Sequence, residues 1–501
     1  MRSKKALKNI IVSFLLQIIT IICGFVIPKI TIQHFGSSVN GLVSSIAQFL
    51  AYITLLESGV GPVVKAALYK PIAEKNNKQI ANVLKASEKF FKTIAGIFII
   101  YIIILCVIYP TIINDEFDSL FTISLLLIIS ISTFSEYFFG MTYKLFLHAD
   151  QKSYIVSGIQ IITTILNAIV VVMLIKFGCN IQSVKLASAL IFIFRPIIQN
   201  IYVKKKYNIN FKEADTNYQL EKKWDGLAQH IASVVHENTD VAILTIFSTM
   251  TEVSVYSVYL LVVNGIKNLV LAFTGGIDAS FGDMIAKNEK ETLNKSFKSY
   301  ELFYFTTITI FFACTMLLIV PFVEVYTEGI TDVNYSRPLF AFLIVLAEFV
   351  FSIRLPYNAI TLAAGHFKET KKGAWIEAGI NIIVSIILVI KFGIVGVAIG
   401  TLIAMLVRTI EFIIYASKNI LERNILECIK RITIVIIQLI LINVFNLIFL
   451  NNFKVNTYLD WIIYAIITAI VVSIIVLSIN VIVYKDDLKD AIKQFKNIRK
   501  K

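Results

Sequence analysis

The sequence has little charge and few residues that would interrupt its apolar stretches. Charged residues make up 16% of the 501-residue chain, against about 25% in soluble domains. There are 8 prolines and 21 glycines, and 57% of the residues are hydrophobic, with a mean hydropathy of +0.78. A soluble core could not bury this much apolar surface, which excludes a water-soluble fold and predicts an all-α integral membrane protein.

Recognisable reaction and cofactor motifs are also missing. The five cysteines are scattered without the paired spacing of a disulfide framework or a zinc site. There is no GxxxxGK[ST] loop, no GxSxG and no connection long enough to hold a nucleotide site, so we expect neither an enzyme nor a bound cofactor or metal. The net charge of +14 does not indicate nucleic acid as a partner, because in a membrane protein basic residues gather on the cytoplasmic side.

Apolar runs bounded by charge clusters predict fourteen membrane-spanning helices. They lie near 10–33, 40–69, 93–113, 119–147, 154–175, 183–203, 224–247, 252–286, 300–321, 336–365, 374–390, 394–417, 432–450 and 458–484. Alternate connections, counted with both termini, hold 36 Lys and Arg residues on one side and 5 on the other. This asymmetry predicts that both termini, including the basic tail after residue 484, are cytoplasmic. The excess of Lys over Arg and the many isoleucines suggest an AT-rich genome, which fits a bacterial cytoplasmic membrane.

The chain resembles itself at a shift near 214 residues. The segment LNAIVVVMLIKFG, ending at Gly178, parallels INIIVSIILVIKFG, ending at Gly393, and Arg195 falls opposite Arg408. We therefore predict a six-helix lobe at 1–203, a linker at 204–223, a second six-helix lobe at 224–417, and two extra helices with the tail at 418–501. An even number of spans gives both lobes the same orientation. Such parallel repeats enclose a substrate cavity between halves that rock against each other.

Of the 47 Lys and Arg residues, the 36 and 5 counted in the connections and termini leave six deeper in the spans, where each is costly unless it faces a cavity or a partner. They are Lys29, Lys65, Arg195, Lys267, Arg354 and Arg408. Lys65 and the acidic Glu377 lie near enough to the inner interface to snorkel, and Arg408 and Glu411 are spaced to pair on one helical face. For the deeper residues, cavity lining is the favoured interpretation.

Acidic and imidazole groups in the spans are candidates for H⁺ or Na⁺ coupling. Glu57 lies in the second span, and QHIASVVHENTD places His236, Glu237 and Asp240 within the seventh. Titratable groups inside a membrane often mark such pathways. A wet inner vestibule, in which polar residues cost little, explains the seventh-span cluster equally well.

Three stretches resemble a known family: LLESGVGPVVKAAL from residue 55, NTDVAILTIFSTMTEVSVYSVY from 238 and KFGIVGVAIGT from 391. Together with the repeat they are similar to the polysaccharide-exporter branch of the multidrug/oligosaccharidyl-lipid/polysaccharide (MOP) superfamily, and most of all to Wzx-type flippases of O-antigen and capsule repeat units. The resemblance covers nearly the whole chain, but its short apolar motifs say little about the substrate.

The resemblance implies two six-helix lobes in a V-shaped arrangement around a cationic cavity that works by alternating access. It implies an undecaprenyl-pyrophosphate-linked oligosaccharide as substrate, membrane lipids and the polysaccharide polymerase machinery as partners, and a lipid-tail groove at the last two helices. The six basic residues would bind the pyrophosphate and sugars. Two alternatives stay open: a cation-coupled exporter of drugs or small molecules on the same fold, and a membrane polysaccharide polymerase.

Overall fold

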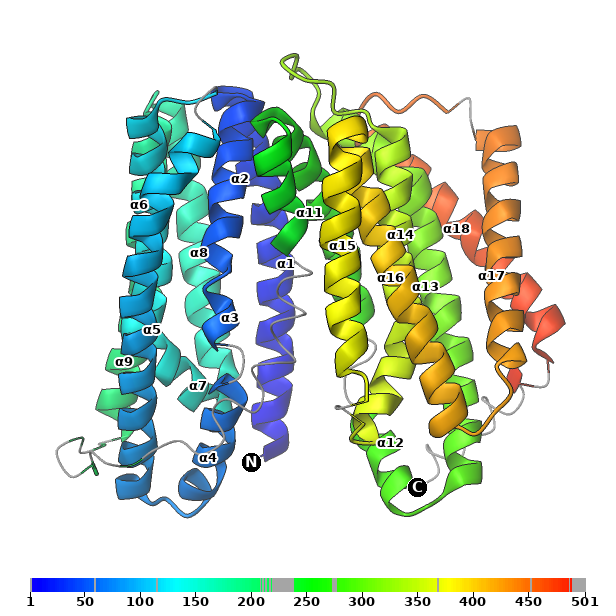
Figure 1. Cartoon of the computed structure of the whole chain (residues 1–501), viewed down its shortest axis with the longest axis horizontal. Coiled ribbons are helices and arrows are strands. Elements are labelled where there is room, and N and C mark those ends of the chain that lie inside the picture. The colour runs from blue at the N-terminus through cyan, green and yellow to red at the C-terminus, as the bar shows by residue number, and fades with distance from the viewer. Residues whose placement is uncertain are drawn as a thin grey trace. The chain divides into compact units, whose positions relative to one another are not determined.

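The computed structural model is built of helices (Figure 1). It describes residues 2–57, 60–113, 116–207, 209, 211, 214, 215, 218, 238–272, 277–366, 369–450, 453–485, 487 and 488. Thirteen helices in this part are long and apolar enough to cross a membrane, and a shorter apolar helix covers Asn238–Phe247. The chain is therefore a multi-pass membrane protein.

The chain forms two compact units, Met1–Val255 and Tyr256–Lys501, so that the boundary between them falls within α11. The first unit contains α1 (Arg2–Phe35), α2 (Ser37–Ala51), α3 (Thr54–Glu57), α4 (Val60–Ala73), α5 (Asn77–Ile112), α6 (Ser119–Ser135), the π-helix η1 (Glu136–Gly140), α7 (Met141–Ala149), α8 (Ser153–Lys176) and α9 (Ile181–Tyr207). Within it, α8 packs against both α1 and α9. The second predicted span is thus divided into shorter helices, and the fourth contains a π-helical turn.

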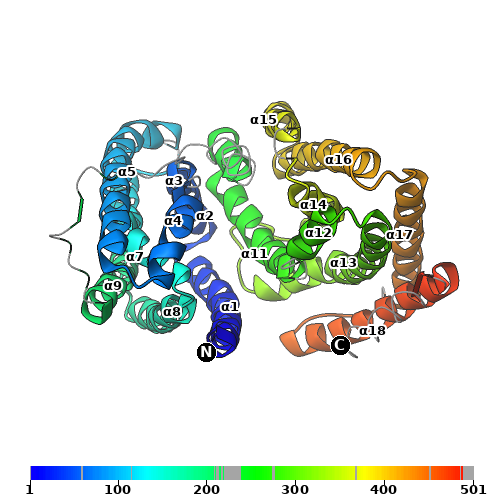
Figure 2. The same cartoon turned by 90° about the horizontal axis from the view of Figure 1, so that it is seen from below.

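The second unit contains most of α11 (Met250–Ala272), then α12 (Ile277–Ala286), α13 (Lys290–Tyr326), α14 (Pro338–Ala363), α15 (Lys371–Phe392), α16 (Ile394–Asn419), α17 (Leu426–Phe445), the π-helix η3 (Asn446–Leu450) and α18 (Tyr458–Val483). Here α16 packs against α14 and α15, while α13 packs against α14 and α18 (Figure 2). The two extra helices therefore join the unit through α13.

The internal duplication is confirmed by its turns. Lys75 and Asn288, Gln151 and Gly365, and Gly178 and Gly393 all have positive φ, each pair roughly 214 residues apart. Backbone hydrogen bonds around these turns repeat as well: the Lys152 N–H donates to Leu147 O, and the His366 N–H donates to Thr361 O. Left-handed backbone is uncommon outside glycine, so three matched instances reflect a common design of the two copies.

The apolar side chains divide between a packed interior and a surface suited to lipid. On α18, Thr468, Val472 and Val476 recur every four residues on a buried face, and Val472 and Val476 pack with Ala313 and Ile442. The opposite face exposes isoleucines such as Ile470, which is 54% exposed. In a membrane that face meets acyl chains.

The predicted spans agree with the observed helices, with one limit. Only Asn238–Phe247 of the seventh predicted span belongs to the described part of the chain. His236, Glu237, most of the predicted linker at 204–223 and the tail from residue 489 lie outside the described residues.

Candidate functional site

Charged side chains form a connected network inside the second unit. Arg354 Nη1 on α14 donates to Glu377 Oε1 on α15 at 2.6 Å, and Arg408 Nε on α16 lies 3.5 Å from Glu377 Oε2. Arg408 Nη1 also donates to Glu411 Oε2 at 2.6 Å and to the Thr370 carbonyl at 2.8 Å. Arg354, Glu377 and Arg408 are each less than 10% exposed. A single carboxylate therefore bridges two buried guanidinium groups from neighbouring helices.

Lys267 joins the same region from α11. Its Nζ lies 3.5 Å from Glu348 Oε1 on α14 and 4.5 Å from the centre of the Phe351 ring. The Arg354 guanidinium lies 4.6 Å from that ring. All three basic residues predicted in the second unit thus gather around α14, and each has a carboxylate partner.

The network needs a glycine beside it. A Cβ atom at Gly373, in the first turn of α15, would lie 1.6 Å from Glu411 Oε2 and 2.1 Å from Arg408 Nη1. The Arg408–Glu411 pair predicted from the sequence spacing therefore forms against bare backbone. No sequence pattern marked this role for Gly373, or the ring contact of Phe351.

Arg195 in the first unit has different neighbours. Its Nε donates to Thr163 Oγ1 at 2.7 Å and its Nη2 donates to Thr164 Oγ1 at 2.8 Å, both on α8. The guanidinium also lies 4.1 Å from the centre of the Phe192 ring. Among the ion pairs of the described residues, none includes Arg195. Its positive charge is oriented by neutral hydroxyls and is not cancelled in contact.

The π-helix η1 fixes the position of α9 near Arg195. A Cβ at Gly140 would lie 2.3 Å from the Cβ of Pro196, so α9 touches the bare backbone of the bulge. Glu136, at the start of η1, accepts a hydrogen bond from Lys144 Nζ at 3.0 Å. Single π-turns are frequent at functional sites because they redirect side chains within a helix.

Glu57, the last residue of α3 in the divided second span, contacts the π-helix η1. Tyr137 OH donates to Glu57 Oε2 at 2.9 Å, which links α3 to η1. Glu136, Lys144 and Tyr137 all act electrostatically on Glu57, and Lys65 and Lys144 both act on His148. Glu57 and Lys65, predicted as separate candidates, therefore belong to one polar region of the first unit.

Two candidates remain, Lys29 and Asp240. Lys29 follows Pro28 within α1 and is half-buried. Asp240, in the short helix Asn238–Phe247, is 8% exposed and acts electrostatically on Tyr52. Tyr52 OH donates to the Asn238 carbonyl at 3.0 Å, which fixes this helix against the end of α2.

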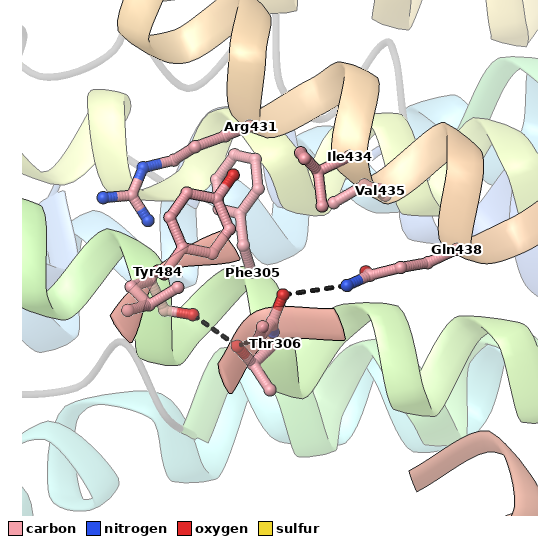
Figure 3. Close-up of a pocket in the computed structure, with 9 residues that line it drawn as sticks. Phe305, Thr306, Arg431, Ile434, Val435, Gln438 and Tyr484 are labelled. Carbon is pink, nitrogen blue, oxygen red and sulfur yellow. Dashed lines mark hydrogen bonds between the residues drawn. The ribbon is translucent and has the colours of Figure 1, made fainter. Parts of the chain in front are cut away.

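A second buried network was missed because its two arginines, Arg423 and Arg431, lie in a predicted loop. Glu301 on α13 is fully buried and accepts hydrogen bonds from Arg423 Nη2 at 2.6 Å and Nη1 at 3.0 Å. Arg431 Nε on α17 lies 2.9 Å from Glu301 Oε2, and Tyr357 OH also donates to this carboxylate. The helix α17 begins about six residues before the predicted span, so that Arg431 lies in this helix rather than in a loop (Figure 3).

Comparison with known proteins places the fold. No family model matches the sequence, and no curated protein matches it either. Among solved structures, the lipid II flippase MurJ in an inward closed conformation is 17% identical to this chain and superposes on it with a TM-score of 0.70. The superposition covers 95% of this chain and 99% of the MurJ chain.

Two MATE transporters are also similar to this chain. An inward-facing multidrug resistance MATE family transporter of the MOP superfamily is 13% identical with a TM-score of 0.64, covering 81% of this chain and 97% of its own. The Vibrio cholerae MATE transporter VcmN in its bent form is 14% identical with a TM-score of 0.52. This match covers 83% of this chain and 97% of the VcmN chain. These neighbours are a flippase and transporters rather than enzymes, and the chain has the fold that they share.

Proposed function

We propose that the protein is a flippase of the Wzx type, which moves an undecaprenyl-pyrophosphate-linked oligosaccharide from the inner to the outer leaflet by alternating access. The substrate would serve the assembly of O-antigen or capsule at the bacterial cytoplasmic membrane, with both termini inside. The observation that carries this proposal is the likeness to a lipid flippase over 95% of the chain, against 81% for the MATE transporter. The part of this chain that the flippase covers beyond the coverage of the MATE transporter is as long as roughly two spans with their connections.

Arg195 is the residue best suited to the pyrophosphate. A pyrophosphate needs fixed positive charge in a region of low dielectric constant, where charge interactions exceed those in water. Arg195 is held by two hydroxyls and has the Glu136 carboxylate acting on it only electrostatically, whereas Lys267, Arg354 and Arg408 have carboxylates in contact. We infer that the first unit provides most of the binding charge, with Lys29 and Lys65 as further contributors.

Coupling to H⁺ or Na⁺ is proposed for Glu57 in the same unit. It lies where the second span is divided into short helices, and breaks in spanning helices commonly form ion sites in transporters. Replacement of Glu57 by Gln is expected to abolish the dependence of transport on an imposed ion gradient. Substrate binding would be retained, and a variant that keeps the full gradient dependence would remove Glu57 from this role.

A cation-coupled exporter on the same fold is the second candidate. The charge balance of the second unit favours it, because Glu348, Glu377 and Glu411 neutralise its three basic residues. An exporter predicts that deletion of the gene leaves surface polysaccharide unchanged and raises sensitivity to organic cations.

The deciding experiment is deletion of the gene followed by lipid extraction. The flippase predicts loss of surface polysaccharide and accumulation of a polyprenyl-pyrophosphate oligosaccharide whose sugars are inaccessible from outside. A single repeat unit exposed on the outer face would instead indicate a polymerase or another late step. Co-purification with the polymerase would test whether the two assemble.

A further inference from the structure

The repeat places a threonine in the first copy where the second copy has a glutamate. Thr163 of α8 and Glu377 of α15 are separated by the shift of the repeat, and each lies one helical turn before an asparagine, Asn167 in the first copy and Asn381 in the second. The helix α8 packs against α9 as α15 packs against α16. Thr163 and Glu377 therefore occupy equivalent positions in the two copies.

Both side chains contact the matched arginine of the following helix. Arg195 Nε donates to Thr163 Oγ1 at 2.7 Å, and Arg408 Nε lies 3.5 Å from Glu377 Oε2. Thr163 and Glu377 are both buried. The same atom of each arginine thus faces a neutral hydroxyl in the first unit and a carboxylate in the second.

The Thr163 hydroxyl orients Arg195 without adding charge. Its Oγ1 donates to the carbonyl oxygen of Ile159 at 2.9 Å, which leaves a lone pair to accept from Arg195 Nε. Such a bond to the preceding turn is usual for threonine in a helix. Thr164 Oγ1 accepts from Arg195 Nη2 at 2.8 Å. The guanidinium is therefore fixed in position by two acceptors that leave its charge intact.

Arg195 also keeps donors that a ligand can use. A guanidinium has five N–H groups, and within the part of the chain that the structure describes Arg195 Nη1 donates to no acceptor. The Arg195 side chain is half-buried, whereas Arg408 is buried. Arg408 Nη1 already donates to Glu411 Oε2 and to the Thr370 carbonyl. Of the two matched arginines, Arg195 is the one that can bind a further group.

The group beside the arginine decides how strongly an anion is attracted. A guanidinium that touches a carboxylate gains little from a second anion, because the carboxylate repels that anion at a similarly short distance. This is the situation of Arg408 beside Glu377. Glu136 acts on Arg195 without contact and is itself paired with Lys144 at 3.0 Å. An anionic group at Arg195 is therefore attracted by a charge that no touching carboxylate cancels.

We propose that Thr163 sets the specificity of the first unit for an anionic substrate group. Thr163 is a positioning residue, because it acts through Arg195: it orients the guanidinium and keeps a carboxylate out of the position that Glu377 has in the second copy. The inference rests on the proposed function and adds the residue that determines the charge of the binding site. Thr163→Glu would give Arg195 the counter-charge that Arg408 has, at the expense of the pyrophosphate.

Binding of undecaprenyl pyrophosphate to the full chain in detergent tests the proposal, with undecaprenol as the uncharged comparison. Thr163→Glu and Thr163→Gln introduce side chains of the same shape that differ in charge. We expect Thr163→Glu to bind the pyrophosphate at least about tenfold more weakly than Thr163→Gln, and the two to bind undecaprenol equally. In an Arg195→Gln background the difference should fall below about twofold, because contacting residues are not additive.

Each outcome bears on a different step. Equal pyrophosphate binding by Thr163→Glu and Thr163→Gln overturns the role of Thr163 and leaves the proposed function standing. A difference that persists undiminished in the Arg195→Gln background also overturns it, because Thr163 would not act through Arg195. A folded wild type that binds the pyrophosphate no better than undecaprenol rejects both the proposed function and this inference. If Thr163→Glu fails to fold, the shorter pair Thr163→Asp and Thr163→Asn provides the same comparison.

Discussion

Arg195 and Arg408 occupy the same position in the two copies of the repeat but contact groups of different charge. Arg195 follows Ile181, the first residue of α9, at the same interval at which Arg408 follows Ile394, the first residue of α16. Arg195 is held by the Thr163 and Thr164 hydroxyls, and Arg408 by carboxylates. The two copies thus share an arginine at this position but differ in the groups that contact it.

This difference predicts different effects of matched substitutions. Arg195→Gln is expected to lower transport at least about tenfold while the protein stays folded, because the loss of one charge-assisted contact to an anion costs roughly 1.5–3 kcal/mol. Surface polysaccharide in a complemented deletion strain measures transport, and the melting temperature measures folding. Arg408→Gln is expected to lower the melting temperature first. Wild-type transport by Arg195→Gln would contradict the role given to this residue.

Glu377 is expected to matter for stability more than for substrate binding. Glu377→Gln leaves the Arg354 and Arg408 guanidinium groups without their shared charge. Breaking a buried pair of this kind lowers the free energy of unfolding by about 3 kcal/mol. Thermal unfolding in detergent checks this, with Glu291→Gln as the control, because Glu291 pairs with Lys295 on an exposed surface. Equal melting temperatures for the two variants would contradict the bridging role.

Two glycines of α15 make a matched pair. Gly373→Ala places a Cβ within 1.6 Å of Glu411 Oε2, so the Arg408–Glu411 pair must move, and the variant is expected to lose about 1–3 kcal/mol. At Gly379 a Cβ meets nothing within 4 Å, and Gly379→Ala is expected to be neutral or to stabilise the helix by up to about 1 kcal/mol. Comparison of their melting temperatures tests the packing, and the same change in both would disprove it.

Asp150 gives a pH-dependent prediction outside the spans. Burial alone would raise its pKa, but hydrogen bonds from Lys152 and Tyr207 outweigh burial and hold the pKa of Asp150 below its ordinary value. Lys5 Nζ, from the start of α1, adds a contact at 3.5 Å. A lowered pKa in the folded state contributes stability above the unfolded pKa, and this contribution disappears as the pH falls through the folded value.

We therefore expect Asp150→Asn to be less stable than the wild type by about 1 kcal/mol at pH 7. The difference should shrink below pH ~4, as the wild-type carboxyl becomes protonated. Melting temperatures between pH 3 and 7 test this. A difference that stays constant with pH would show that the charge of Asp150 contributes nothing.

Much of the fold followed from the sequence, because lipid imposes simple rules on it. Apolar length fixed the spans, and the KFG turns at Gly178 and Gly393 revealed the duplication that the positive φ angles confirm. The division of the second span near Tyr52 was not predicted, because its residues are as apolar as those of a continuous helix.

The candidate sites were predicted only as a set of residues. The position of a charged residue within an apolar span identifies Arg195, Arg354 and Glu57 as candidates, but it does not predict which residues they contact. Partners such as Thr163 and Tyr137 are common residue types whose role depends on helix packing. Arg431 was assigned to a loop because α17 begins earlier than its apolar run.

The central claim is that this chain moves a lipid-linked oligosaccharide, with Arg195 binding its pyrophosphate. The most direct measurement reconstitutes the wild type and Arg195→Gln in liposomes that contain a fluorescent polyprenyl-pyrophosphate oligosaccharide, and follows the fraction of label that an added membrane-impermeant quencher reaches. The account predicts that this fraction rises with time for the wild type and stays near the protein-free level for the variant. Equal rates of label exposure for the wild type and Arg195→Gln, or no movement of the labelled lipid by a folded wild type, would contradict it.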